Sequence, residues 1–316
     1  MSCSCMFVCA QALCMAFYME RKRTWTAGWF LFGMSAAVTI AYFITETYAP
    51  RARLFSNHLF MILVQVVVFF APLVVWGVLS TRQKQPIRLR ITRFSTQGLM
   101  FIICSALAVS ILSLLINILM STITNNFKDV IAPQYLNHSG NIILALFALV
   151  LIPAIVEEFL FRGAVLSVYE QYGTGIGIFL SALAFAMLHG SFNNFLAPFI
   201  CGLLYAYMAY TLDSIWPAIL GHLVNNTFTF LLGLYASAGH DDNFWTYFLV
   251  AMLVLFIALC YFATRFLETL IRKGKIKRFN KRKAPLGKVL FITVLAPGFL
   301  LFVGVFLFRL YLSVLF

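Results

Sequence analysis

The chain has 316 residues, of which 62% are hydrophobic and only 10% are charged. Soluble domains carry about 25% charged residues, so this composition excludes an ordinary soluble protein. The net charge is +13, but the basic residues are gathered in short segments between apolar runs. That distribution is typical of the loops of a membrane protein, and it argues against nucleic acid as a partner.

Runs of about 20 apolar residues, the length that crosses a bilayer as a helix, recur along the whole chain. They predict an all-α fold, a polytopic transmembrane helix bundle of about ten spans (eight to ten). The predicted spans are 2–19, 25–46, 58–79, 98–120, 141–161, 174–190, 194–212, 215–236, 244–264 and 289–314. Spans 174–190 and 194–212 are short and flank the tight segment "HGSFNN", so we expect broken helices in part of that region.

Three short segments hold most of the basic residues: three in 20–24, five in 80–97 and ten in 265–288. Alternating the ten spans places these segments on one side of the membrane and both chain termini on the other. Lys and Arg accumulate in cytoplasmic loops and attract anionic lipid headgroups. We therefore expect a multi-pass integral protein, in a bacterial plasma membrane, whose basic segments, including the loop 265–288, are cytoplasmic and contact anionic lipids.

The cysteines carry no metal-binding pattern, since none pairs with His at ligand spacing and no C-x-x-C occurs. We interpret them as small apolar side chains, with lipidation of the four within the first 14 residues as the alternative. The seven are Cys3, Cys5, Cys9, Cys14, Cys104, Cys201 and Cys260.

The stretch "PAIVEEFLFRG" places three charges inside an apolar run. Charged side chains in a bilayer are costly and commonly functional. On a helix that Pro153 starts or bends and that continues to about Tyr172, Glu158 and Arg162 are i and i+4, so they can form an ion pair. Glu157 points about 100° away from Glu158 and lacks that partner. We therefore interpret Glu158 as a structural residue and Glu157 as a candidate catalytic residue.

Two later spans also carry polar pairs. "FAMLH" places Phe185 and His189 four residues apart, and "HLVNN" does the same for His222 and Asn226, with Asn225 beside them. A polar group in lipid needs a partner. We expect these side chains and the free glutamate to face one another across a small wet cavity formed by three helices.

Such a cavity suits hydrolysis of an acyl bond, most naturally a peptide bond. A glutamate beside a neutral histidine can hold and deprotonate a water, while a second histidine and an asparagine amide donate to the oxyanion. The chain has no G-x-S-x-G motif, which argues against a covalent acyl-enzyme, and it also lacks the zinc-binding motif HExxH. This mechanism needs no cofactor. A zinc ion held by Glu157, His189 and His222 is the open alternative.

In order and spacing, these motifs resemble those of the CAAX protease and bacteriocin-processing family of intramembrane endopeptidases, also called Abi: EExxxR, FxxxH and HxxxN. The resemblance covers residues 141–236, so we expect N-terminal transmembrane helices over 1–140, a CAAX-protease-like catalytic core over 141–236, and C-terminal transmembrane helices over 237–316.

The resemblance also implies roles. Glu157 would be the catalytic base, acting with His189 on water, and His222 with Asn226 would form the oxyanion site. Glu158, Arg162 and Phe185 would support them. The implied substrates are membrane-associated peptides or proteins, such as prenylated C-terminal peptides or the leader peptides of bacteriocin precursors, and part of the family is described as metalloproteases.

Two other functions fit the same residues. One is a non-catalytic membrane scaffold or immunity protein, in which the motif helices only bind a partner. The other is a transporter that uses Glu157 and the histidines as a proton relay. The inverted repeats common in transporters are not evident in the sequence.

Overall fold

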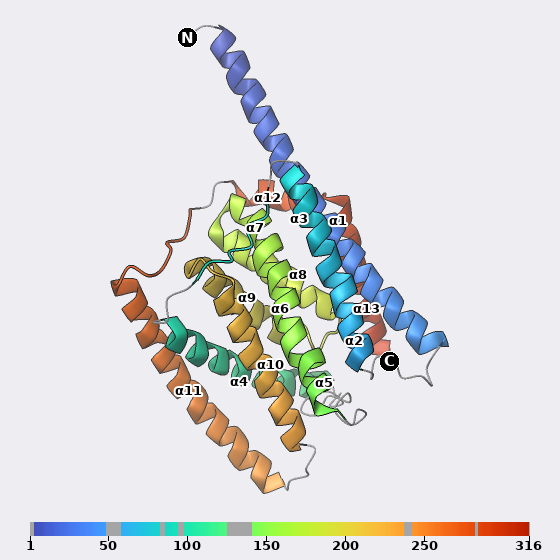
Figure 1. The fold of residues 1–316 in the computed structure, drawn as a ribbon, viewed down its shortest axis with the longest axis vertical. Helices are drawn as coiled ribbons and strands as arrows, with labels where there is room; N and C mark the ends of the chain where they lie inside the picture. Colours follow the sequence, from blue (N-terminus) through green and yellow to red (C-terminus); the bar gives the residue numbers. More distant parts are fainter. Residues whose placement is uncertain are drawn as a thin grey trace.

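The computed structural model describes residues 3–48, 58–82, 86–93, 98–124, 141–236, 242–281 and 284–315, and within these ranges every regular element is helical (Figure 1). The all-α polytopic bundle is confirmed. The longer elements are α1 (Cys3–Tyr48), α2 (His58–Gln65), α3 (Ala71–Arg82), α4 (Leu99–Thr124), α8 (Thr174–His189), α9 (Leu196–Thr211), α10 (Trp216–Ala236), α11 (Asp242–Arg272), α12 (Leu286–Val294) and α13 (Pro297–Leu315).

Five of the described helical segments are long and apolar enough to cross a membrane, or six if α12 and α13 count as one span. That is fewer than the ten spans expected. Helices α8 and α9 have only 16 residues each, about 24 Å at ~1.5 Å per residue, shorter than the ~30 Å hydrocarbon core. The connections between predicted spans at 47–57, 121–140 and 237–243 fall mainly outside the described residues, as do the side chains of the four N-terminal cysteines.

The prediction of two spans separated by a loop at 20–24 is wrong, because α1 runs unbroken from Cys3 to Tyr48. Lys and Arg are good helix formers, and no proline or glycine occurs between Glu20 and Ala27 to end the helix. Figure 1 shows that the first half of α1 projects beyond the other helices. It begins past one end of the bundle and α13 ends at the other, so the two termini do not share a side.

The last predicted span, 289–314, is also wrong as a single helix. α12 ends at Val294, α13 starts at Pro297, and the two are bent by 76°. Proline disfavours a helical conformation in the residue before it and suits the first position of a new helix. α13 then packs along α1, where a Cβ on Gly28 would lie 2.7 Å from the backbone nitrogen of Phe299.

The helix that carries the paired glutamates continues from Ile142 to Tyr172, as predicted. It is built from α5 (Ile142–Leu146), η6 (Phe147–Leu151), α6 (Ile152–Glu158), η7 (Phe159–Val165), α7 (Leu166–Tyr169) and η8 (Glu170–Tyr172). The π-helical stretch η6 ends two residues before Pro153. Proline has no backbone N–H to donate the usual helical hydrogen bond, and its ring crowds the carbonyl four residues earlier. The wider turn there absorbs the proline without ending the helix.

The three basic segments meet at one end of the bundle. Arg23 Nη2 donates to the carbonyl of Ser167 (3.4 Å). Arg90 pairs with Glu170 at the end of the same long helix, and the amide of Ile215 donates to the Arg90 carbonyl (2.9 Å).

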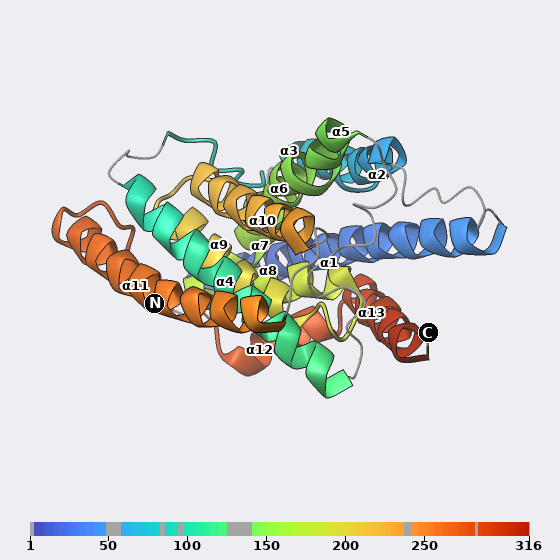
Figure 2. The same ribbon diagram turned by 90° about the horizontal axis from the view of Figure 1, so that it is seen from below.

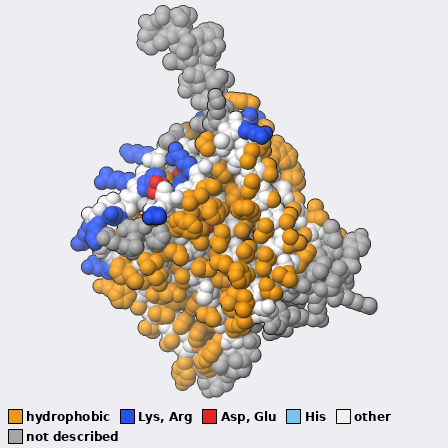
Figure 3. Space-filling view, in the orientation of Figure 1, with side chains coloured by type: hydrophobic (Ala, Val, Ile, Leu, Met, Phe, Trp, Pro, Cys, Tyr) orange, Lys and Arg blue, Asp and Glu red, His pale blue; other side chains and the backbone are white. Residues whose placement is uncertain are grey.

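The third basic segment joins the same end. The amide of Lys277 donates to the Thr211 carbonyl (2.8 Å), and its Nζ pairs with Asp213 (2.8 Å). The amide of Asn280 donates to Thr174 Oγ1 at the start of α8 (2.9 Å). Figure 3 shows the Lys and Arg side chains gathered at this end, while hydrophobic side chains cover most of the remaining visible face. We call this surface the basic end.

Helices α8, α9 and α10 lie in the interior of the assembly. α9 packs against α8, α4 and α10, and α11 lies along α4, as the perpendicular views of Figures 1 and 2 show. α8 and α9 approach closely at Gly202, where a Cβ would lie 3.1 Å from the Cα of Ala182. The three helices that carry the motifs, which are the glutamate helix, α8 and α10, therefore border one region inside the bundle.

Candidate active site

Glu158 and Arg162 form the predicted i, i+4 ion pair, with Arg162 Nη1 3.0 Å from Glu158 Oε1 and both side chains fully buried. Arg162 also donates through Nη2 to the carbonyl of Gly202 (3.3 Å) and lies over the ring of Phe185, 4.4 Å from its centroid. The buried arginine therefore ties the glutamate helix to both α8 and α9.

Glu158 has a second partner that the sequence analysis did not identify. His222 Nδ1 lies 2.9 Å from Glu158 Oε1, so one carboxylate oxygen meets both Arg162 and the histidine of α10. Tyr205 of α9 stacks on the His222 ring, with centroids 5.4 Å apart and planes 20° apart. Between the carboxylate and the stacked ring, His222 has a fixed orientation.

His189 is the last residue of α8. Its Nδ1 lies 3.0 Å from the Phe185 carbonyl, one turn earlier. The Phe185 ring contacts both histidine rings edge-on, at centroid distances of 5.0 Å to His189 and 5.8 Å to His222. The FxxxH phenylalanine thus separates the two histidines and packs on Arg162 as well.

The end of α8 is held by a residue far along the chain. Arg309 of α13 donates from Nη1 to the carbonyl of Leu188 (2.7 Å) and from Nη2 to that of His189 (3.2 Å). Helix ends leave carbonyls without intrahelical donors, and a cation there also complements the helix dipole. Gly190 follows in the left-handed conformation (φ 64°), and a Cβ there would collide with the Arg309 guanidinium.

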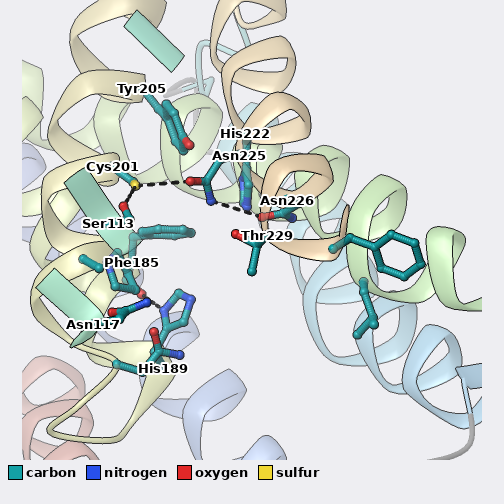
Figure 4. Close-up of a pocket in the computed structure, with 15 residues that line it drawn as sticks. Ser113, Asn117, Phe185, His189, Cys201, Tyr205, His222, Asn225, Asn226 and Thr229 are labelled. Atoms are coloured by element: carbon teal, nitrogen blue, oxygen red, sulfur yellow. Dashed lines mark hydrogen bonds between the residues drawn. The ribbon is translucent and has the colours of Figure 1, made fainter. Parts of the chain in front are cut away.

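A cavity of about 300 Å³ opens between α4, α8, α9 and α10 (Figure 4). His189, His222 and Asn226 all line it, although they come from different motifs on two helices. Its other lining residues are Ser113, Asn117, Leu149, Phe185, Asn194, Ala197, Pro198, Cys201, Tyr205, Asn225, Thr229 and Phe230.

The side chains of Asn225 and Asn226 on α10 belong to a short chain of polar contacts. Asn225 Nδ2 donates to Asn226 Oδ1 (3.4 Å), and Asn225 Oδ1 lies 4.0 Å from the thiol of Cys201. Because its oxygen already accepts a bond, Asn226 presents its amide nitrogen as the donor for a ligand. Both asparagines therefore belong to the cavity, and their roles differ.

Glu157 lies beside the cavity and does not line it. Its side chain is half buried on α6, and its charge interacts with those of His222, Glu158 and Arg162. The structure thus brings His189, His222 and Asn226 to one cavity, while Glu157 lies outside its lining and within electrostatic range of His222.

Zinc does not fit the predicted ligand set as these residues are arranged. Among the described residues, no three His, Cys, Asp or Glu side chains are close enough to hold a metal ion. The Nδ1 atoms of His189 and His222 face the Phe185 carbonyl and Glu158, and Phe185 lies between the two rings.

Several lining residues were missed by the sequence analysis. Ser113 and Asn117 are polar residues four apart inside the apolar run 98–120, the same spacing that drew attention to the other motifs. Arg309 is a charge inside the last apolar run, which is itself a signal of function or pairing in a membrane helix. Cys201 and Tyr205 gave no comparable signal.

Comparison with known families supports the resemblance stated above. Residues 139–228 match the family model described as type II CAAX prenyl endopeptidase Rce1-like. A search of curated proteins and a search of solved structures each found no match to this chain. The matched segment starts before α5 and ends within α10, so it contains the paired glutamates, His189 and His222, and the model that it matches describes a family of peptidases.

Proposed function

We propose that the protein is an intramembrane endopeptidase that hydrolyses a peptide bond of a membrane-associated substrate with an activated water. One observation carries this proposal: the FxxxH and HxxxN motifs line one cavity of about 300 Å³ with His189, His222 and Asn226, and the glutamate motif contacts it through His222, which pairs with Glu158. Concave sites with a few convergent polar groups are the usual location of a substrate.

In the proposed reaction, Glu157 accepts a proton from a water in the cavity, and His189 orients that water. The resulting hydroxide attacks the carbonyl carbon of the substrate, and the carbonyl oxygen becomes an oxyanion. Glu157 then returns the proton to the departing amine, so the base ends the cycle as it began.

The oxyanion is stabilised from α10. Asn226 donates from its amide nitrogen, since its oxygen is held by Asn225. His222 is fixed through Nδ1 by Glu158, so its Nε2 edge remains for the substrate and is the proposed second contact to the oxyanion. Donors held in place before the reaction are what makes such a site effective.

The proposed substrates are prenylated C-terminal peptides or leader peptides at the membrane. We further propose a bacterial plasma membrane as the setting, with the basic end on the cytoplasmic side and in contact with anionic lipids. The segment 265–288 supplies much of that positive surface.

The test is cleavage by purified protein of a quenched prenylated peptide and of a leader-peptide library, with wild type, Glu157→Ala and His189→Ala side by side. Cleavage by wild type and its loss in both variants, each still folded, is the expected result. Cleavage that persists in both variants would contradict the proposal. A chelator should leave the rate unchanged in the glutamate mechanism, whereas loss restored by zinc would assign a metal.

A folded wild type that cleaves none of the peptides would favour the scaffold or immunity function instead. In that case Glu157→Ala would retain the biological activity of the wild type. A transporter would show substrate flux in sealed vesicles without cleavage.

A further inference from the structure

One wall of the cavity is polar. That wall is formed by Ser113 and Asn117 of α4 together with Asn225 and Thr229 of α10. Ser113 and Asn117 are four residues apart, so they lie on the same face of α4, one turn above the other. α4 and α10 pack against each other, which puts the two polar rows along one cavity.

Most of this wall is already ordered by its own contacts. Ser113 Oγ lies 3.1 Å from Cys201 Sγ, which in turn approaches Asn225. The exception is Asn117, whose Oδ1 is buried and has no hydrogen-bond partner among the described residues. A buried acceptor left without a donor is costly, so a ligand or water that donates to Asn117 is favoured. Figure 4 shows Asn117 at the same end of the cavity as His189.

The chemistry of the lining indicates what that ligand is. None of the fifteen lining residues is Asp, Glu, Lys or Arg. Two amides and two hydroxyls line one side, and Leu149, Pro198 and Phe230 supply apolar surface. A peptide group has one donor and one acceptor and no charge, and an asparagine amide offers the matching acceptor and donor. The wall therefore matches neutral backbone in the interior of a peptide better than a charged chain end.

We propose that the polar faces of α4 and α10 form a subsite for the backbone of an extended peptide, in which Asn117 accepts a hydrogen bond from a substrate N–H. This inference rests on the proposed function and adds a substrate-binding residue to it. α4 lies outside the segment that matches the family model, so this contact comes from a helix that precedes that segment in the chain.

The test combines a protein change with a substrate change. Asn117→Leu removes the amide and keeps a similar volume. Thr122→Ala on the same helix is the matched control, because the Thr122 hydroxyl is exposed and bonds only its own helix, at the Ile118 carbonyl. The substrates are a quenched farnesylated peptide and copies of it methylated on one backbone nitrogen at a time, which lose one N–H donor each.

Asn117→Leu should raise KM by about five- to tenfold, the size of one lost hydrogen bond, with kcat within about twofold of wild type. Binding lost equally in ground and transition states changes KM and not kcat, whereas a general loss of structure would lower kcat as well. One N-methylated peptide should show the same increase with wild type and no further increase with Asn117→Leu. Such non-additivity identifies a direct contact.

An unchanged KM in Asn117→Leu, or effects that add for every N-methylated peptide, would overturn the inference while leaving the protease function standing. If wild type cleaves none of the peptides, the proposed function fails by itself, and binding is then measured by fluorescence anisotropy with the farnesylated peptide. Weaker binding to Asn117→Leu than to Thr122→Ala would still support the subsite. Equal binding, or none to wild type, would overturn it.

Discussion

At the scale of single residues, the two adjacent glutamates occupy different environments. Glu158 is fully buried between Arg162 and His222, whereas Glu157 is half buried and makes no hydrogen bond or ion pair with the described residues. A buried ion pair is sensitive to loss of one partner, because the other charge is then left uncompensated. Glu158 is therefore held in a buried ion pair, whereas Glu157 is not.

Replacing Glu158 by glutamine should destabilise the protein. The neutral side chain keeps the shape but leaves the Arg162 charge buried and the His222 ring without its carboxylate, at a cost of roughly 3–5 kcal/mol. Thermal unfolding in detergent measures the effect. The matched control is Glu268→Gln, which breaks an exposed pair with Arg265 and should change stability by about 1 kcal/mol or less. Equal unfolding temperatures for the two variants would refute the structural role of Glu158.

The sequence predicted the Glu158–Arg162 pair because helical spacing alone decides it. The contact of His222 with Glu158 could not be predicted, since it joins residues 64 positions apart and depends on how α10 packs on α6. The same holds for Asn117, whose polarity was visible in the sequence but whose place in the cavity follows from the packing of α4 on α9 and α10.

At the scale of helices, the end of α8 depends on α13. The carbonyls of Leu188 and His189 receive their hydrogen bonds from Arg309. The last helix of the chain therefore helps to position a residue of the candidate active site, although it lies outside the family match.

Arg309→Gln should lower stability and slow cleavage. Two charge-assisted bonds to the end of α8 are lost, each worth about 1.5–3 kcal/mol at most, and His189 loses its fixed position. Arg309→Lys keeps the cation at the helix end and should retain part of both properties. Unfolding temperature and cleavage rate are measured together. If the Arg309→Gln protein had the unfolding temperature and the cleavage rate of the wild type, α13 would not be needed to hold the end of α8.

Helix boundaries were predicted well where apolar runs end at clear signals and poorly where charges interrupt a helix. The long helix through Pro153 was predicted to continue to Tyr172, and it does. Residues 20–24 looked like a loop because they are basic. In the structure Arg21 stacks over the ring of Trp25 at 4.1 Å and Arg23 bonds Ser167, so these charges are accommodated on a continuous helix at the basic end.

At the scale of the whole molecule, the contacts of Arg23, Arg90 and Lys277 bring the three basic segments to one end. The asymmetric distribution of basic residues predicted this grouping correctly. The unbroken α1 changes the expected position of the N-terminus, which lies beyond the basic end, while α13 ends at the opposite end (Figure 1).

Tags on the two ends of the chain should therefore be accessible from opposite sides of sealed vesicles. The N-terminal tag should share its side with Arg88→Cys, an exposed position of the basic end, and the C-terminal tag with Phe192→Cys in the turn after α8. A membrane-impermeant maleimide reads the cysteines, with wild type as the control for native thiols. Both tags on one side would instead support a turn at residues 20–24.

The central claim is that the converging motif helices form a hydrolytic site in which Glu157 is the base. The most direct measurement is the cleavage rate of Glu157→Gln against wild type, with unfolding temperature and peptide binding followed in parallel. We expect kcat to fall by about a hundredfold or more, because a general base is removed, while the unfolding temperature and peptide binding stay unchanged. Cleavage within about tenfold of wild type by a folded, peptide-binding Glu157→Gln protein would contradict this claim.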